Sequence, residues 1–167
     1  VHSPAIDMTT RGRDVAVLFG DGAGAVVLEA TDDAERGLIG FALHTEGRHR
    51  DLLKIEFPGT RQKPYIQQKN LESASIYPHM EGRQVFKHAS TRMPEAVMEV
   101  LGSQHLKPED VDLYLFHQAN LRINEMVMKQ LGQPMDKAMN NIQRYGNCSA
   151  ASIPILLAEA QRAGRMQ

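Results

Sequence analysis

His117 and Asn147 stand at points of the sequence where chemistry is often found. His117 follows the apolar run 111–116, which we interpret as a buried strand, and precedes a helical pattern. Asn147 follows Gly146 and precedes a second helical pattern. In α/β proteins ligands bind at the carboxyl ends of strands, and the N–H groups at a helix N-terminus favour negative charge. The two side chains could therefore point into one cleft and stabilise a developing anion.

On spacing alone, each residue also has a structural explanation. A single His is often a structural residue, and an Asn before a helix is most simply an N-cap whose side chain accepts a backbone hydrogen bond. The spacing by itself leaves the structural and the functional explanations open.

A glycine-rich turn is a second candidate site, because glycines after a strand can bring backbone N–H groups close to a phosphate. Here Gly20, Gly22 and Gly24 lack the third glycine of the dinucleotide-binding motif, and the segment that follows reads as strand. We therefore prefer a tight turn in which the glycines allow positive φ or close packing. A nucleotide-binding domain is the weakest alternative.

The elements that must position these residues alternate between strand and helix. Apolar runs predict strands at 14–19, 24–30, 38–45 and 111–116. Helical patterns follow Gly82, with a kink or break at Pro94, and cover 118–131 and 149–163, with Pro154 in the first turn. Residues 46–79 read as a long, variable loop. This alternation predicts α/β layering.

Composition excludes several classes of protein. The 167 residues carry 19 Lys and Arg against 20 Asp and Glu, a formal charge of −1, so we expect no nucleic-acid partner. No apolar stretch approaches the roughly 20 residues of a membrane span, so we expect no membrane association. The single cysteine, Cys148, cannot form an internal disulfide and has no metal-ligand pattern around it, so we expect a cytoplasmic protein without a metal site.

Three motifs carry a family resemblance. They are Phe19-Gly-Asp-Gly-Ala-Gly-Ala25, Phe116-His-Gln-Ala-Asn-Leu-Arg-Ile123 and Tyr145-Gly-Asn-Cys-Ser-Ala-Ala-Ser-Ile-Pro154. In this order they resemble the β-ketoacyl-acyl-carrier-protein synthases III, condensing enzymes of fatty acid synthesis. The resemblance covers nearly the whole chain, with 46–79 as the variable part.

The resemblance implies a thiolase-like fold of two similar halves, of which residues 1–167 would be the C-terminal half: a mixed sheet covered by helices and lacking its last strands. His117 and Asn147 would donate hydrogen bonds to the thioester carbonyl of malonyl-acyl-carrier protein (malonyl-ACP). The acyl-CoA primer would be carried by a cysteine of the N-terminal half. The complete enzyme would be a cytoplasmic homodimer with thioester substrates and no cofactor.

Further residues receive roles from the same resemblance. Substrate-binding residues would be Met80, Gly82, Phe86, Asn120 and Arg122, although core packing explains Met80 and Phe86 equally well. Carrier-protein docking would involve Lys87, Arg122 and Lys129, although the two lysines also suit an ordinary solvated surface.

The sequence departs from the family pattern at Cys148, where the family usually has Thr. Because the family nucleophile lies in the other half, we interpret Cys148 as a space-filling residue whose thiol could still be activated by a helix N-terminus. Family members also continue into a glycine-rich segment that completes an oxyanion hole. We therefore predict that this chain alone is inactive.

The interpretation is an acyltransferase half that begins fatty acid synthesis by decarboxylative condensation of an acyl-CoA primer with malonyl-ACP. One alternative is a related acyltransferase of polyketide or quinolone synthesis. Another is a non-catalytic half that only binds carrier protein.

Overall fold

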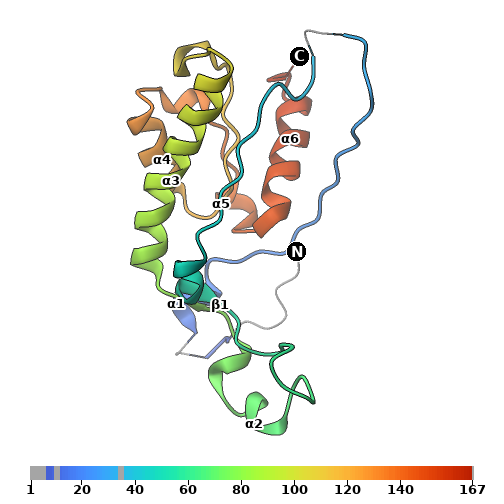
Figure 1. Cartoon of the computed structure of the whole chain (residues 1–167), viewed down its shortest axis with the longest axis vertical. Helices are drawn as coiled ribbons and strands as arrows, with labels where there is room; N and C mark the ends of the chain where they lie inside the picture. Colours follow the sequence, from blue (N-terminus) through green and yellow to red (C-terminus); the bar gives the residue numbers. More distant parts are fainter. Residues whose placement is uncertain (1–6, 10–11, 34–35, 167) are drawn as a thin grey trace.

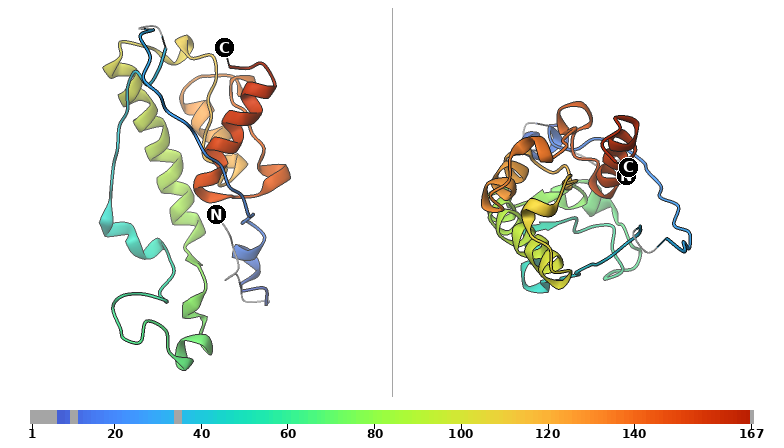
Figure 2. Two further views of the ribbon diagram at one scale, coloured as in Figure 1. Left: turned by 90° about the vertical axis from the view of Figure 1, so that its right-hand side faces the viewer. Right: turned by 90° about the horizontal axis from the view of Figure 1, so that it is seen from above.

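The computed structural model describes residues 7–9, 12–33 and 36–166, and helices are its main elements. The α-helices are α1 (Arg13–Ala16), α2 (Gln68–Leu71), α3 (Gly82–Ser103), α4 (Leu121–Gln130), α5 (Ile142–Tyr145) and α6 (Ser152–Arg162). Shorter 3₁₀ turns are η1 (Gly47–Leu52), η2 (Ala74–Ile76), η3 (Pro108–Asp110), η4 (Met135–Lys137) and η5 (Ser149–Ala151). Figures 1 and 2 show the long helix α3 beside α4.

The core lies where α3 and α4 meet the chain segment that leads to His117. Its buried apolar members are Tyr114, Phe116, Ile123, Val127, Met128, Leu131 and Ala138. The α4 members recur at helical spacing, as expected for one buried face. The rings of Tyr114 and Phe116 stack with centroids 5.7 Å apart. Half-buried apolar side chains of α3 cover this cluster, so burial of apolar surface holds His117 next to two packed helices.

The prediction that Pro94 kinks or breaks its helix is wrong. Helix α3 is continuous from Gly82 to Ser103 and contains Pro94. Proline has no N–H to donate to the carbonyl four residues earlier, which here belongs to Ser90. Gln130 Nε2 at the end of α4 donates a hydrogen bond of 2.8 Å to that carbonyl. A side chain of the neighbouring helix therefore replaces the lost bond, and this helps the proline to fit inside a regular helix.

The predicted strands at 14–19, 24–30 and 38–45 are wrong for the described residues. Residues 13–16 form α1, and only Phe19 makes a bridge, to Asn147. Residues 24–30 and 38–45 lie in no strand, and Val27, Leu28 and Leu43 are almost fully exposed at 89%, 87% and 87%. An apolar run becomes a strand only when a neighbouring strand pairs with it, and no described segment does so here.

The sheet of the described residues is a single antiparallel pair, β1 (Leu53–Lys54) and β2 (His79–Met80), with Leu53 opposite Met80. These strands, with η1, α2 and η2, are the short pieces of structure in the predicted loop 46–79. The predicted strand 111–116 is reduced to a bridge between Tyr114 and Ala138. Backbone hydrogen bonds join Tyr114 to Lys137 and Met139, so the segment before His117 is extended and anchored.

The helices predicted after His117 and after Asn147 are present. The helix predicted at 118–131 is α4, and the one predicted at 149–163 is η5 followed by α6, with Pro154 in the first turn of α6 as expected. Within the described residues, none of the helices combines the length and the apolar character that crossing a membrane would require.

Candidate active site

An open cavity of about 760 Å³ brings His117 and Asn147 together. Its wall is built by α1 and the residues after it, by β1 and the start of α3, and by the turns before α4 and α6. The described lining residues are Asp14, Val15, Leu18, Phe19, Leu53, Met80, Gly82, Arg83, Val85, Phe86, Ala89, His117, Ala119, Asn120, Arg122, Ile123, Asn147 and Ser149. The structure therefore joins the two residues in one cavity, as the sequence predicted.

His117 is held at its Nδ1 atom, which lies 2.7 Å from Ser152 Oγ at the start of α6. The Ser152 hydroxyl also lies 2.8 Å from the Ser149 carbonyl and accepts a hydrogen bond from the Gln118 N–H. The ring is reached by solvent through the cavity, yet burial by the protein around it lowers the pKa of His117 below its ordinary value, against the opposing effect of the Ser149 carbonyl. This lowered pKa favours the neutral imidazole at pH 7.

Asn147 is fixed by both its backbone and its side chain. Its N–H donates to the Leu18 carbonyl at 2.8 Å, and its carbonyl accepts from the Gly20 N–H at 3.0 Å. Its side-chain Oδ1 accepts from the Ser149 N–H at 2.8 Å, which is the kind of backbone bond that its position before a helix suggested. Because Oδ1 is occupied by this bond, the Nδ2 group is the part of the amide that can donate to a ligand in the cavity.

The buried side chain of Gln118 joins the segment around His117 to the start of α5. Its Oε1 accepts hydrogen bonds from the N–H groups of Asn141 and Ile142, at 3.0 and 3.2 Å, and its Nε2 donates to the Phe116 carbonyl. The Gln118 side chain is fully buried, at 0% exposure. A fully bonded buried amide of this kind fixes the positions of the segments on either side of it. The start of α5 is thereby held against the residue that follows His117.

A second network holds α5 against α6. Glu159 of α6 accepts hydrogen bonds from Asn141 Nδ2 at 2.9 Å, Tyr145 OH at 2.9 Å and Arg144 at 2.8 Å. Burial alone would raise the pKa of Glu159, but the Asn141 and Tyr145 hydrogen bonds and the Arg144 charge outweigh it, and the pKa is lowered. The ionised carboxylate therefore anchors residues 141–145, which lead directly to Asn147.

All five predicted substrate-binding residues line the cavity, namely Met80, Gly82, Phe86, Asn120 and Arg122. Asn120 is also the N-cap of α4, where its Oδ1 accepts a hydrogen bond from the Arg122 N–H at 3.0 Å. Phe86 both lines the cavity and packs against the core, so the structural and the functional interpretation hold together for this residue.

Of the three residues predicted to dock carrier protein, Arg122 alone lines the cavity. Lys87 on α3 and Lys129 on α4 are exposed, and they lie on two helices that pack side by side. Arg83, which the sequence analysis did not single out, also lines the cavity and is exposed. Arg83 and Arg122 therefore bring two guanidinium groups to its wall.

Cys148 is buried, with 1% exposure, and is absent from the described lining of the cavity. Its Sγ lies 3.4 Å from the Tyr145 carbonyl. A side chain at Gly22 would reach within 3.0 Å of Cys148, and one at Gly24 within 2.5 Å of Pro154. The glycine-rich turn thus serves close packing against the start of α6, and Cys148 fills space there, as predicted.

Leu53, Arg83 and Ser152 contribute to the site but have no strong sequence signal that singles them out. Leu53 lies in the loop that has no periodic pattern, and Arg83 has the appearance of an ordinary surface residue at the start of a helix. Ser152 lies inside the third motif, where its spacing of three residues from Ser149 could have suggested a contact at the helix start.

Two family models match the chain. The model described as 3-Oxoacyl-[acyl-carrier-protein (ACP)] synthase III matches residues 1–47, and the model of its C terminal matches residues 101–167. Together the matches extend over more than half of the chain. The chain belongs to the 3-oxoacyl-ACP synthase III family. The segment between the two matches contains residues 48–79, which are most of the loop that the sequence marked as variable.

Individual synthases of this family align with nearly the whole chain. The β-ketoacyl-ACP synthase III of Roseiflexus sp. (strain RS-1) is 43% identical over 157 residues, which are 93% of this chain and 46% of the relative. That of Acaryochloris marina is 42% identical and covers 100% of this chain and 49% of its own length. The chain therefore spans about half the length of the synthases that it matches.

Solved synthase III structures share the fold. The enzyme of Pseudomonas aeruginosa PAO1 superposes with a TM-score of 0.79 at 38% identity, over 93% of this chain and 45% of that chain. The enzyme of Aquifex aeolicus VF5 superposes with a TM-score of 0.80 at 39% identity, over 93% of this chain and 44% of that chain. The similarity confirms the predicted thiolase-like α/β fold, and among the described residues helices are the main regular elements beside one small two-stranded sheet.

Proposed function

We propose that this chain is the C-terminal half of a condensing enzyme that joins an acyl-CoA primer to malonyl-ACP at the start of fatty acid synthesis. The observation that carries the proposal is the placement of His117 and Asn147 in one cavity, each held by hydrogen bonds on the side away from a ligand. Membership of the synthase III family supports the same reaction class.

In the proposed reaction, His117 Nε2 and Asn147 Nδ2 donate hydrogen bonds to the thioester carbonyl oxygen of malonyl-ACP. The bond between the malonyl methylene carbon and its carboxylate breaks, carbon dioxide leaves, and the electron pair forms an enolate. Fixed neutral donors stabilise such an oxyanion strongly, because they need no reorganisation during the reaction. The lowered pKa of His117 keeps the ring uncharged for this role.

The enolate carbon then attacks the acyl group of the primer, forming a carbon–carbon bond and releasing the thiolate that carried it. We assign that thiolate to a cysteine of the N-terminal half, because Cys148, the single cysteine of the sequence, is buried behind the glycine-rich turn. On this proposal, the isolated 167-residue chain has no condensing activity.

Arg83 and Arg122 suit the phosphate groups of CoA and of the pantetheine arm, since guanidinium groups bind phosphate through charge-assisted hydrogen bonds. Lys87 and Lys129 would extend this positive surface toward an acidic carrier protein. The exposed apolar residues of 24–30 and 38–45 would pack against the N-terminal half. The complete enzyme would be a cytoplasmic homodimer that uses no cofactor.

A related acyltransferase of polyketide or quinolone synthesis would use the same two donors with another primer. Condensation assays on the complete gene product with a series of acyl-CoA primers and malonyl-ACP distinguish these proposals. Efficient use of short acyl-CoA primers supports the synthase III assignment, whereas activity confined to an aromatic primer contradicts it. Binding of carrier protein without condensation or decarboxylation would show a non-catalytic half instead.

A further inference from the structure

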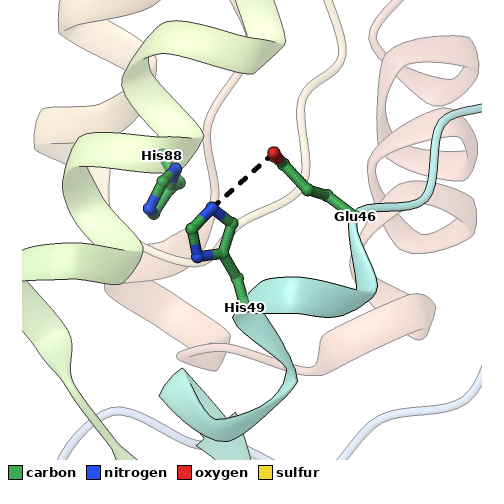
Figure 3. A group of neighbouring side chains, drawn as sticks. All are labelled: Glu46, His49 and His88. Carbon is green, nitrogen blue, oxygen red and sulfur yellow. Dashed lines mark ion pairs between the residues drawn. The ribbon is translucent and has the colours of Figure 1, made fainter.

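Three side chains that can bind a metal ion gather outside the cavity, where the loop 46–79 meets α3. Figure 3 shows Glu46 just before η1, His49 within η1 and His88 on α3, with their polar groups turned toward one another. One ligand atom from each residue can be chosen so that all three lie within 4.8 Å of one another. All three residues are half-buried.

The spacing of these atoms is close to that of a metal site. His49 Nε2 lies 3.6 Å from Glu46 Oε1, and the imidazole rings of His49 and His88 have centroids 4.1 Å apart. Bonds of about 2.0–2.2 Å in a tetrahedral zinc site place neighbouring ligand atoms roughly 3.3–3.6 Å apart. Rotation of these half-buried side chains would bring the three atoms to the spacing that one ion requires.

The surrounding charges both help and oppose a bound cation. The carboxylate of Glu46 would attract a bound cation, and Arg48, Arg92 and His49 lie around it. Arg48 contacts Glu46 Oε1, and Arg92 lies 3.7 Å from Oε2. The two arginines therefore compete with a metal ion for the carboxylate.

We propose that Glu46, His49 and His88 bind a divalent transition-metal ion such as Zn²⁺, with water in the remaining position. Two imidazole nitrogens and one carboxylate oxygen suit this class of ion better than they suit Ca²⁺ or Mg²⁺, which favour oxygen ligands. The sequence predicts no metal site, because the surroundings of Cys148 hold no ligand pattern and because His49 and His88 lie far apart in the chain.

A metal ion at this position would fasten η1 to α3 beside the wall of the cavity. Leu53, Val85 and Ala89 line both the cavity of His117 and the shallow hollow that contains His49 and His88. The ion would thus restrain the segment that carries Leu53 and that leads toward Met80. Its role is structural, and it takes no part in the condensation.

The proposal is tested by titrating the complete, tag-free protein with Zn²⁺ by calorimetry, and with Co²⁺ by visible absorption. We expect one ion per chain, and a loss of at least about tenfold in affinity for His49→Ala and for His88→Ala, as for removal of groups from other metal sites. Arg48→Gln removes a competing cation and should tighten binding severalfold. Glu46→Gln keeps the shape of the side chain and should weaken binding.

His44→Ala is the matched control, because His44 pairs with one carboxylate, Glu99, at 2.6 Å, and thus offers a two-ligand site only. It should leave the stoichiometric binding unchanged. Zn²⁺ should also raise the melting temperature of the parent protein and not that of His88→Ala. Absence of saturable binding, or binding that survives both His49→Ala and His88→Ala in folded variants, would overturn the proposal.

Discussion

His117 Nδ1 and Ser152 Oγ lie 2.7 Å apart, and this contact joins the two motifs that form the cavity. The Ser152 hydroxyl has two acceptors within reach, His117 Nδ1 and the Ser149 carbonyl. If it donates to Nδ1, the ring proton resides on Nε2 and faces the substrate. The donor role proposed for His117 requires this tautomer, so we predict that Ser152 acts as a positioning residue in the proposed reaction.

Replacing Ser152 by alanine should therefore lower kcat about 10- to 100-fold with little change in KM, by analogy with other groups that orient a histidine. Nitrogen NMR of labelled His117 should show a shift of the tautomer away from protonated Nε2. Ser103→Ala is the control, because Ser103 is exposed at the end of α3 and is absent from the described lining of the cavity. Equal effects of the two substitutions would contradict the positioning role.

The pH dependence of the reaction should reflect the lowered pKa of His117. Because burial depresses this pKa below the ordinary 6.5, the ring stays neutral at pH values where an exposed histidine is half protonated. The rate should remain high at pH 6.5 and fall only below it, as pH drops through the lowered pKa. The unfolded chain binds the proton first, so this group also reduces stability as pH falls below 6.5. A rate already halved at pH 6.5 through His117 would contradict the assignment.

Gln130→Ala should destabilise the protein by about 1–3 kcal/mol, because it leaves the Ser90 carbonyl without the donor that replaces the missing N–H of Pro94. Urea unfolding measures the loss. Pro94→Ala supplies the matched test, because the N–H of an alanine at this position can donate to the Ser90 carbonyl within the helix. In that background Gln130→Ala should cost much less. An equal cost in both backgrounds would show that the side chain acts in another way.

Close packing of the glycine-rich turn predicts that Gly24→Ala destabilises the protein, because its Cβ would lie 2.5 Å from Pro154 Cγ. The helical residue Gly102 has open space around its Cβ position, so Gly102→Ala should be neutral or stabilising by up to about 1 kcal/mol. Thermal unfolding compares the two variants. Similar melting temperatures for both would contradict the packing account of this turn.

The parts of the fold that were predictable from sequence are those fixed by local signals. Helix α4 has a continuous apolar face and begins at Asn120, whose side chain caps it, so its position followed from the pattern alone. His117 and Asn147 were found because each stands at a junction between elements, and the motifs around them carry the family resemblance.

The sequence predictions that were wrong or missing concern features that depend on residues far away in the chain. The apolar runs at 24–30 and 38–45 carry a strand signal, but a strand needs a neighbour to pair with, and the local sequence does not encode that neighbour. Pro94 fits within α3 with the help of a side chain thirty-six positions later in the chain, Gln130. The Glu46, His49 and His88 cluster was missed for the same reason, since its members come from separate elements.

The central claim is that His117 and Asn147 act together as donors to the thioester oxygen of malonyl-ACP. The most direct measurement is carbon dioxide release from malonyl-ACP by the complete protein, for His117→Ala, Asn147→Asp and the double variant. We expect each single substitution to lower the rate about 10²- to 10³-fold, with little further loss in the double variant, because the donors work as a unit. Variants that fold normally and release carbon dioxide at the parent rate would contradict the account.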